Sequence, residues 1–253
     1  MPFKDKVYTV TGAASGIGRS TAVRLAELGA SGLAISDVNE AGLEETKQLC
    51  LKHGAVVRTT KVNVAIPSEI SAWIQDAYDH FGRLDGAANV AGVAGGDGTT
   101  TVATVDERDW KRTMAINLDG VMYCMRAQLP KITKPGGAIV NVSSTSGLRG
   151  LPHSAAYATS KFGVIGLTES AAGEFGKEGV RINAILPGPV DTAIFRDGEA
   201  KGLFDSKVMG GSTLLGRMGH PDEVAHVLCF MLSDEASFVT GAHWTVDGGY
   251  AAC

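Results

Sequence analysis

The sequence predicts an α/β fold in which helices cover both faces of a single parallel, doubly wound sheet. Short runs rich in β-branched residues alternate with helical stretches along the 253-residue chain. These runs are apolar throughout instead of alternating between apolar and polar residues, which indicates strands buried on both faces. No linker or break in composition divides the chain. We therefore expect one domain spanning residues 1–253.

The elements follow one another in a regular order. Strands are expected at 6–11, 32–37, 55–64, 84–92, 137–144, 180–188 and 243–249. Helices are expected at 16–28, 40–53 and 67–80, and a further apolar helix begins near Tyr157. Residues 190–218 are weakly structured but lie within the alternation, so we expect a lid or binding segment there.

Composition and charge exclude several classes of protein. Hydrophobic residues make up 44% of the chain and charged residues 20%, as in a folded globular protein. The net charge is −4 and no Lys/Arg cluster occurs, so neither nucleic acid nor a membrane surface is an expected partner. No apolar run approaches the ~18–20 residues of a membrane span. The four cysteines and six histidines match no metal-ligand spacing. We expect a cytoplasmic protein without a metal.

A glycine-rich turn, TGAASGIGRS, joins the first strand to the first helix. Gly12 allows the sharp turn, Gly16 lets the backbone approach a pyrophosphate, and Gly18 permits close packing of helix on strand. The helix N-terminus adds unpaired N–H groups and the positive end of its dipole. The turn therefore predicts a Rossmann-type, dinucleotide-binding sheet.

Asp37 closes the second strand, about 20 residues beyond the glycines. A carboxylate there can accept hydrogen bonds from both ribose hydroxyls and repels a 2′-phosphate, which favours NAD over NADP. The alternative is that Asp37 only caps the following helix. Arg19 could reach a 2′-phosphate only by turning back.

The turn does not match the phosphate-binding loop of nucleoside triphosphatases. Arg19 stands in place of the lysine of that loop and Ala13 in place of its first glycine, which excludes that class of protein.

Tyr157 and Lys161 lie four residues apart and so share one helix face. An ammonium beside a phenol stabilises the phenolate and lowers the pKa of the tyrosine from about 10. Such a phenol can give a proton to a carbonyl oxygen or take one from an alcohol. Ser144 ends a buried strand, at the sheet edge where ligands bind in this class of fold.

These residues resemble the short-chain dehydrogenase/reductase family along the whole chain. TGAASGIG (11–18) resembles the family's TGxxxGxG loop, NVAG (89–92) its NNAG, and YATSK (157–161) its YxxxK motif. MAINLDG with Asn117, VSS ending at Ser144, LPGPVDT (186–192) and the ending TGAHWTVDGGY resemble further family elements. Each motif is moderately specific alone, and together they are very specific.

The resemblance implies a role for each catalytic residue. Tyr157 would be the acid/base, and Lys161 would hold the nicotinamide ribose and lower the pKa of the tyrosine. Ser144 would orient the substrate oxygen, and Asn117 would help to place a water in a proton relay from Lys161. Ser143 is the neighbouring candidate, but the spacing to Tyr157 favours Ser144.

The resemblance also implies where an NAD cofactor would bind. The expected set is Gly12, Ser15, Gly16, Ile17, Gly18, Asp37, Asn63, Val64, Asn89, Ala91, Gly92, Tyr157, Lys161, Pro187, Gly188, Val190 and Thr192. Asn89 and Gly92 would line the adenosine side. Asn63 stands where the family commonly has Asp, and its amide oxygen can still accept a hydrogen bond from the adenine amine.

The expected substrate pocket is largely apolar, which predicts a hydrophobic or alicyclic secondary alcohol or ketone. Its walls would come from the 93–96 loop and the 193–208 segment, where Leu203 and Phe204 lie. The named substrate residues are Ser144, Val93, Leu148, His153, Tyr157, Ile194 and Phe195. His153 either binds a second polar group of the substrate or is an ordinary loop histidine.

Two other functions compete with this interpretation. The C-terminal region also resembles bacterial fatty-acid reductases, which suggests an NADPH-dependent 3-oxoacyl-thioester reductase, although Asp37 and the acidic pI argue against it. A non-catalytic dinucleotide-binding regulator would have lost Tyr157. The family resemblance further implies a homotetramer or homodimer, with the helix after Tyr157 and the last strand at the interfaces.

Overall fold

A computed structural model describes residues 2–96, 98–200, 202 and 205–252. Its strands are β1 (Val7–Thr11), β2 (Gly32–Asp37), β3 (Val56–Lys61), β4 (Gly86–Asn89), β5 (Ala138–Val142), β6 (Arg181–Pro187) and β7 (His243–Val246). Its α-helices are α1 (Gly16–Glu27), α2 (Glu40–Leu51), α3 (Pro67–Phe81), α4 (Glu107–Met114), α5 (Gly120–Gln128), α6 (Ala155–Phe175), α7 (Ala193–Ala200), α8 (Ser206–Gly211) and α9 (Pro221–Leu232). A π-helical segment, Ala115–Asp119, joins α4 to α5.

The strands form one seven-stranded sheet in the order β3-β2-β1-β4-β5-β6-β7. Every pair of neighbours is parallel. The chain builds outward from β1 to β3 and then returns to place β4 on the other side of β1. This order confirms the predicted doubly wound sheet, and it creates a switch point beside β1 where such folds bind ligands.

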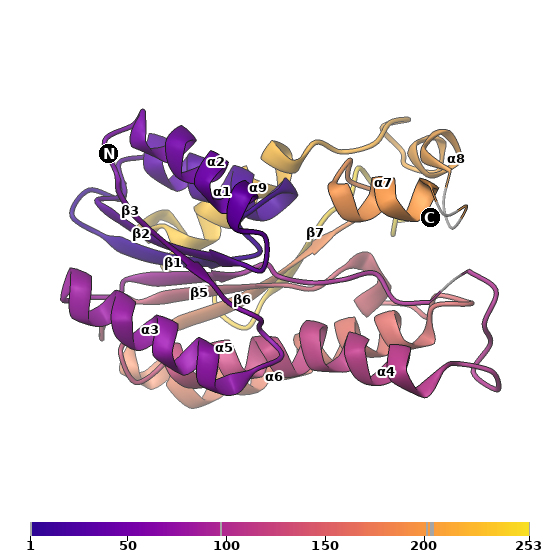
Figure 1. Cartoon of the computed structure of the whole chain (residues 1–253), viewed down its shortest axis with the longest axis horizontal. Helices are drawn as coiled ribbons and strands as arrows, with labels where there is room; N and C mark the ends of the chain where they lie inside the picture. The colour runs from indigo at the N-terminus through magenta and orange to yellow at the C-terminus, as the bar shows by residue number, and fades with distance from the viewer. Residues whose placement is uncertain (1, 97, 201, 203–204, 253) are drawn as a thin grey trace.

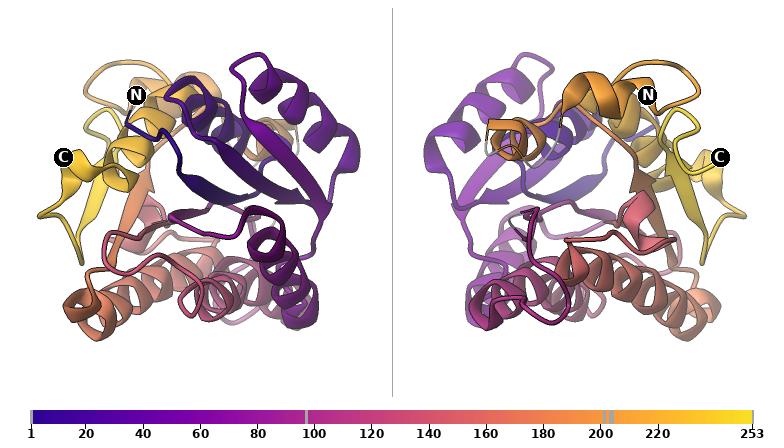
Figure 2. Two further views of the ribbon diagram at one scale, coloured as in Figure 1. Left: turned by 90° about the vertical axis from the view of Figure 1, so that its left-hand side faces the viewer. Right: turned by 90° about the vertical axis from the view of Figure 1, so that its right-hand side faces the viewer.

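Two layers of helices sandwich the sheet. Helices α1, α2 and α9 cover one face, and α3, α4, α5 and α6 cover the other (Figure 1). The views from the two ends show the same three layers (Figure 2). The short helices α7 and α8 lie together at one end of the sheet (Figure 1). None of the described helices is both long and apolar enough to cross a membrane.

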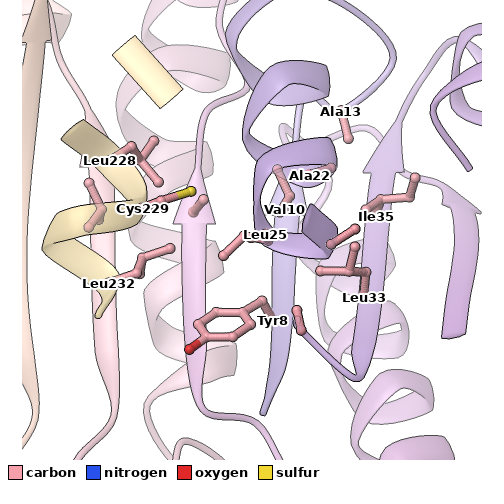
Figure 3. Close-up of a cluster of buried hydrophobic side chains, with 14 of the residues drawn as sticks. Tyr8, Val10, Ala13, Ala22, Leu25, Leu33, Ile35, Leu228, Cys229 and Leu232 are labelled. Carbon is pink, nitrogen blue, oxygen red and sulfur yellow. The ribbon is translucent and has the colours of Figure 1, made fainter. Parts of the chain in front are cut away.

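The larger core cluster lies between the sheet and the α1/α9 side. Tyr8 of β1, Leu33 of β2, Leu25 of α1 and Leu228 of α9 are all buried in it (Figure 3). On the opposite face, the core contains Trp73 of α3 and other apolar residues of α5 and α6. Burial on both faces explains why the strands lack an alternating pattern.

The expected elements differ from the observed ones by shifts of one or a few residues at their ends, whereas helices α4, α5 and α9 were not among the expected elements. The fourth strand is the clearest case, since it ends at Asn89 and not at residue 92. The hydroxyl of Thr11 accepts hydrogen bonds from the backbone N–H groups of Val90 (3.0 Å) and Ala91 (3.1 Å), which turns the chain out of the sheet. The weakly structured 190–218 segment contains α7 and α8. Leu203 and Phe204 lie outside the described residues.

Candidate active site

A cleft of about 820 Å³ opens at the carboxyl ends of the strands. This volume is in the range of sites that bind small molecules and cofactors. The predicted site residues that line it are Gly12, Ser15, Gly16, Ile17, Gly18, Asp37, Asn63, Val64, Ala91, Gly92, Val93, Ser144, His153, Tyr157, Lys161, Pro187, Gly188, Val190, Thr192, Ile194 and Phe195. Residues spread over the whole chain therefore share one cleft.

The glycine turn has a backbone that other residues could not adopt without strain. Gly12 has φ +68°, and a Cβ there would lie 2.9 Å from the backbone of Ala91. Gly18 packs so closely that a Cβ would overlap the carbonyl group of Gly12. Gly16 has φ +51° and lies beside Thr192, from the segment after β6. The turn therefore leaves an open backbone surface at the start of α1, as a pyrophosphate requires.

Asp37 is fixed at the end of β2 by two backbone groups. Its carboxylate accepts hydrogen bonds from the N–H of Ala14 (3.1 Å) and of Asn39 (3.0 Å). The cap of α2 is Asn39, whose side chain accepts from the N–H of Gly42 (3.1 Å). Asp37 is therefore not the helix cap, and its carboxylate lines the cleft.

Arg19 faces away from the cleft, towards α2. Its guanidinium donates to the carbonyl of Ala14 and to the hydroxyl of Thr46 (3.1 Å), and it pairs with the carboxylate of Glu45 at 2.7 Å. Among the described residues that line the cleft, Lys161 is the only lysine or arginine. The end of the cleft near Asp37 thus carries a negative charge without an adjacent cation on its wall.

Ser144, Tyr157 and Lys161 meet where β5 ends and α6 begins. The hydroxyl of Ser144 lies near enough to that of Tyr157 to lower the pKa of the phenol. The ammonium of Lys161 lies 5.7 Å from the centroid of the Tyr157 ring and donates to the carbonyl of Val142 at 3.0 Å. Ser143 has a different contact, since its hydroxyl donates to the carbonyl of Lys161 at 2.7 Å. Ser144 is therefore the serine beside the phenol.

The direction of the pKa shift of Tyr157 differs from the sequence-based expectation. Burial raises the pKa of the phenol, and the nearby Ser144 hydroxyl opposes this effect only in part. Burial also lowers the pKa of Lys161 to about 8. The reason is desolvation, which disfavours the charged form of each group. The expected lowering of the tyrosine pKa is not present in this structure.

Asn117 lies behind the cleft, fully buried in the π-helical segment. Its side chain accepts from the N–H of Val93 (2.8 Å) and donates to the carbonyl of the same residue (2.9 Å). It also donates to the hydroxyl of Ser160 at 3.2 Å. Asn117 thus fixes the loop after β4 to the helix that carries Tyr157. Single π turns within helices are common at functional sites.

Besides Asn117, two predicted residues do not line the cleft. The side chain of Asn89 is buried among polar groups, where it donates to Asn141 (2.9 Å) and exchanges hydrogen bonds with Gln128 (3.2 and 3.0 Å). It holds β4, β5 and α5 together instead of lining the adenosine side. Leu148 is exposed and lies outside the cleft, because the chain turns outward after the short 3₁₀ helix that follows Ser144.

Sequence reasoning missed several residues of the wall. Tyr250, from the C-terminal turn, and Met209, from α8, both line the cleft, as do Ser146 and Leu151. Their spacing carried no signal, because each comes from a different loop or helix. His153 does line the cleft, with φ +65° and its ring nitrogen 3.2 Å from the carbonyl of Thr100. A non-glycine residue in this conformation is typical of functional segments.

The described residues contain no group of three or more His, Cys, Asp or Glu side chains placed to hold a metal ion. The three described cysteines, Cys50, Cys124 and Cys229, are free and buried. Burial raises the pKa of each thiol to about 12. These thiols are therefore packing groups, not nucleophiles.

Comparison with known proteins gives consistent matches over the full length. The family model described as enoyl-(acyl carrier protein) reductase matches residues 12–251. A short-chain dehydrogenase/reductase, ABA4, of Pyricularia oryzae is 41% identical over 99% of this chain and 93% of its own. A cyclohexanol dehydrogenase of an Acinetobacter species is 38% identical over 99% of this chain and 96% of its own. A crystal structure of a levodione reductase superposes with a TM-score of 0.93, at 34% identity and 99% coverage of both chains.

Proposed function

Because the chain belongs to the short-chain dehydrogenase/reductase family, we propose that it transfers a hydride between NAD and a hydrophobic or alicyclic secondary alcohol or its ketone. Family membership makes it an alcohol dehydrogenase/ketone reductase that uses a nicotinamide cofactor. The observation that carries the proposal is that Ser144, Tyr157 and buried Lys161 line one cleft, which the glycine turn shares.

The residues present fit a nicotinamide dinucleotide. The open glycine backbone beside the N-terminus of α1 suits the pyrophosphate, and the Asp37 carboxylate suits the adenosine ribose. Pro187, Val190 and Thr192 would surround the nicotinamide end. When bound, the cofactor supplies the hydride acceptor or donor.

Side chains of this protein would transfer the proton of the substrate hydroxyl. Ser144 would orient the substrate oxygen by donating a hydrogen bond to it. In alcohol oxidation, Tyr157 would take the hydroxyl proton as the carbinol C–H bond breaks, and in ketone reduction it would return that proton to the oxygen. Lys161 lies close enough to favour the phenolate when it is charged. Asn117 would act indirectly, by fixing the loop that contains Val93.

Two contacts support NAD over NADP. In the proposed binding mode the Asp37 carboxylate, which lines the cleft, would face the adenosine ribose and would repel a 2′-phosphate. The candidate cation in the glycine turn, Arg19, has its guanidinium engaged by Ala14, Thr46 and Glu45. Moving it to a phosphate would break these hydrogen bonds. The ammonium of Lys61, opposite Asp37 in the sheet, pairs with Glu40.

The apolar wall beyond the catalytic residues supports an alicyclic substrate. Val93, Leu151, Ile194, Phe195 and Met209 line this region, with few polar side chains among them. The cyclohexanol dehydrogenase and the levodione reductase to which the chain is similar are named for ring-shaped substrates. A saturated ring suits such a wall because its burial removes apolar surface from water. We further propose that residues 190–218, with α7 and α8, act as the lid over this substrate.

Exposed apolar side chains support a homotetramer or homodimer. Phe162 of α6 and Trp244 of β7 are exposed, and Phe238, shortly before β7, is fully exposed. Large aromatic groups at the surface are typical of interfaces. Phe162 and Trp244 come from the two elements that the family resemblance puts at subunit contacts.

The test is a spectrophotometric screen of cyclic and acyclic secondary alcohols, with NAD and NADP side by side. We expect NADH production from a cyclohexanol, and its loss in Tyr157→Phe, while NADH still binds nearly as in the wild type. The surface variant Tyr78→Phe should leave the rate unchanged. Substantial activity in Tyr157→Phe would contradict the assigned chemistry. Activity only with NADPH and a 3-oxoacyl thioester would replace both the cofactor and the substrate class, and NADH binding without turnover would favour a regulator.

A further inference from the structure

Tyr250 lies in a C-terminal turn whose shape is fixed by hydrogen bonds. The Asp247 carboxylate accepts from the N–H of Gly249 and of Ala251, both at 2.9 Å. The N–H of Tyr250 donates to the carbonyl of Asp247 at 3.1 Å. Because both carboxylate oxygens are used within the turn, the backbone that carries Tyr250 is well defined.

This turn is joined to two segments of the active site. The N–H of Leu215, near the end of the lid segment, donates to the carbonyl of Gly248 at 3.1 Å. The N–H of Gly188, which lines the cleft, donates to the carbonyl of Val246 at 3.1 Å. Tyr250 is therefore held between the lid and the segment that follows β6.

Arg149 covers the ring of Tyr250. The guanidinium carbon lies 4.6 Å from the ring centroid, which is the geometry of a cation–π contact. Arg149 is exposed, and it belongs to the loop that begins at Ser144. No carboxylate among the described residues forms an ion pair with it. The cation thus holds one face of the ring while Tyr250 forms part of the cleft wall.

The order of the strands indicates at which end of the cleft Tyr250 lies. Asp37 and Asn63 follow β2 and β3, at one edge of the sheet, and Tyr250 follows β7, at the opposite edge. Ser144 follows β5, between them. Tyr250 therefore lies on the far side of the catalytic serine from the adenosine end, where the part of a substrate remote from its reacting carbon would extend.

We propose that Tyr250, held by Arg149, is a specificity-determining residue whose ring contacts the part of an alicyclic substrate remote from the reacting carbon. This inference rests on the proposed function. The ring, not the hydroxyl, makes the contact, because Leu151 and Met209, which line the same cleft, are apolar. A short acyclic alcohol would not reach Tyr250, so the contact would favour cyclic substrates over acyclic ones.

The experiment compares kcat/KM for cyclohexanol with kcat/KM for 2-propanol. In Tyr250→Ala we expect the ratio of the two to fall about tenfold, mainly through the KM for cyclohexanol, as for the loss of an apolar pocket contact. Tyr250→Phe should keep the wild-type ratio. Arg149→Met should lower the ratio about threefold, because the ring is then less well held. NADH affinity should be unchanged in all three variants.

The matched control is Tyr78→Ala. Tyr78 is also a surface ring with a cation over it, since the ammonium of Lys131 lies 5.3 Å from its centroid, but it does not line the cleft. Its removal should leave the substrate ratio unchanged. If Tyr250→Ala does not fold, Tyr250→Leu serves as the ring-removing variant.

The outcomes separate this inference from the proposed function. One outcome is that the wild type oxidises cyclohexanol while the ring-removing variant keeps the wild-type ratio of kcat/KM values. That result overturns the role of Tyr250 and leaves the proposed function intact. Equal losses in Tyr250→Phe and Tyr250→Ala overturn the ring contact in favour of the hydroxyl. A wild-type protein that oxidises no cyclic alcohol overturns the proposed function, and this inference with it.

Discussion

The buried ammonium of Lys161 should make the stability of the protein depend on pH in a defined way. Burial lowers the pKa of Lys161 from its usual 10.5 to about 8. Between these values, the unfolded chain keeps a proton on this lysine that the folded chain has lost. Stability rises with pH wherever the unfolded state binds more protons. The contribution of Lys161 should therefore become less unfavourable as the pH rises through 8.

The size of the effect follows from the two pKa values. One pKa unit corresponds to about 1.4 kcal/mol, so at pH 7 the lowered pKa destabilises the folded state by about 3 kcal/mol. At pH 9 the folded lysine is largely neutral and the penalty is about 2 kcal/mol. Relative to a variant without the ammonium, the wild type should gain about 1 kcal/mol between pH 7 and pH 9.

Urea unfolding of the wild type and of Lys161→Met, followed by tryptophan fluorescence at pH 7 and pH 9, measures this change. The difference between the two proteins is the informative quantity, because the buried cysteines titrate identically in both. The unpaired carbonyl of Val142 in the variant adds a term that is the same at both pH values. Lys177→Met, at an exposed position, is the control and should behave as the wild type does. A wild-type-minus-variant difference that does not change with pH would refute the reasoning.

Two further predictions concern the cofactor and the assembly. Asp37→Ala should lower kcat/KM with NAD about 10- to 100-fold, because hydrogen bonds to a charged group are worth about 1.5–3 kcal/mol. Its activity with NADP should rise relative to NAD, and an unchanged ratio would mean that Asp37 only supports the backbone at Ala14 and Asn39. Light scattering should give a mass of two or four chains. Trp244→Lys should shift that mass towards the single chain, since an apolar interface does not tolerate an unpaired charge. A single-chain mass for the wild type would contradict the proposed assembly.

Local spacing was sufficient to predict most of the residues that the structure brings together in the cleft. The spacing within one turn was enough to predict the role of Gly12, Gly16 and Gly18. The four-residue spacing of Tyr157 and Lys161 places them on one face of any helix. The alternation of apolar runs and helices then gave the parallel sheet, because a strand buried on both faces needs helices over each of them. These features depend on residues that are close in sequence.

Side-chain direction was decided by the tertiary structure. Asn89 had the right position in its motif, yet its amide is buried against Gln128 and Asn141. Leu148 was expected in the pocket and lies outside it, whereas Tyr250, about a hundred residues further along the chain, lines the wall. No local pattern could report these outcomes, because each depends on how distant strands and loops meet.

The sequence by itself determined the fold class, the glycine turn and the candidate catalytic residues, because these depend on short-range spacing and on the period of apolar residues. Only the tertiary structure decided that Arg19 turns to α2, that Tyr250 joins the site and that burial raises the pKa of Tyr157. The physical reason is that desolvation and long-range packing depend on what surrounds a group in three dimensions. Two residues far apart in the chain acquire a shared environment only when the sheet brings them together.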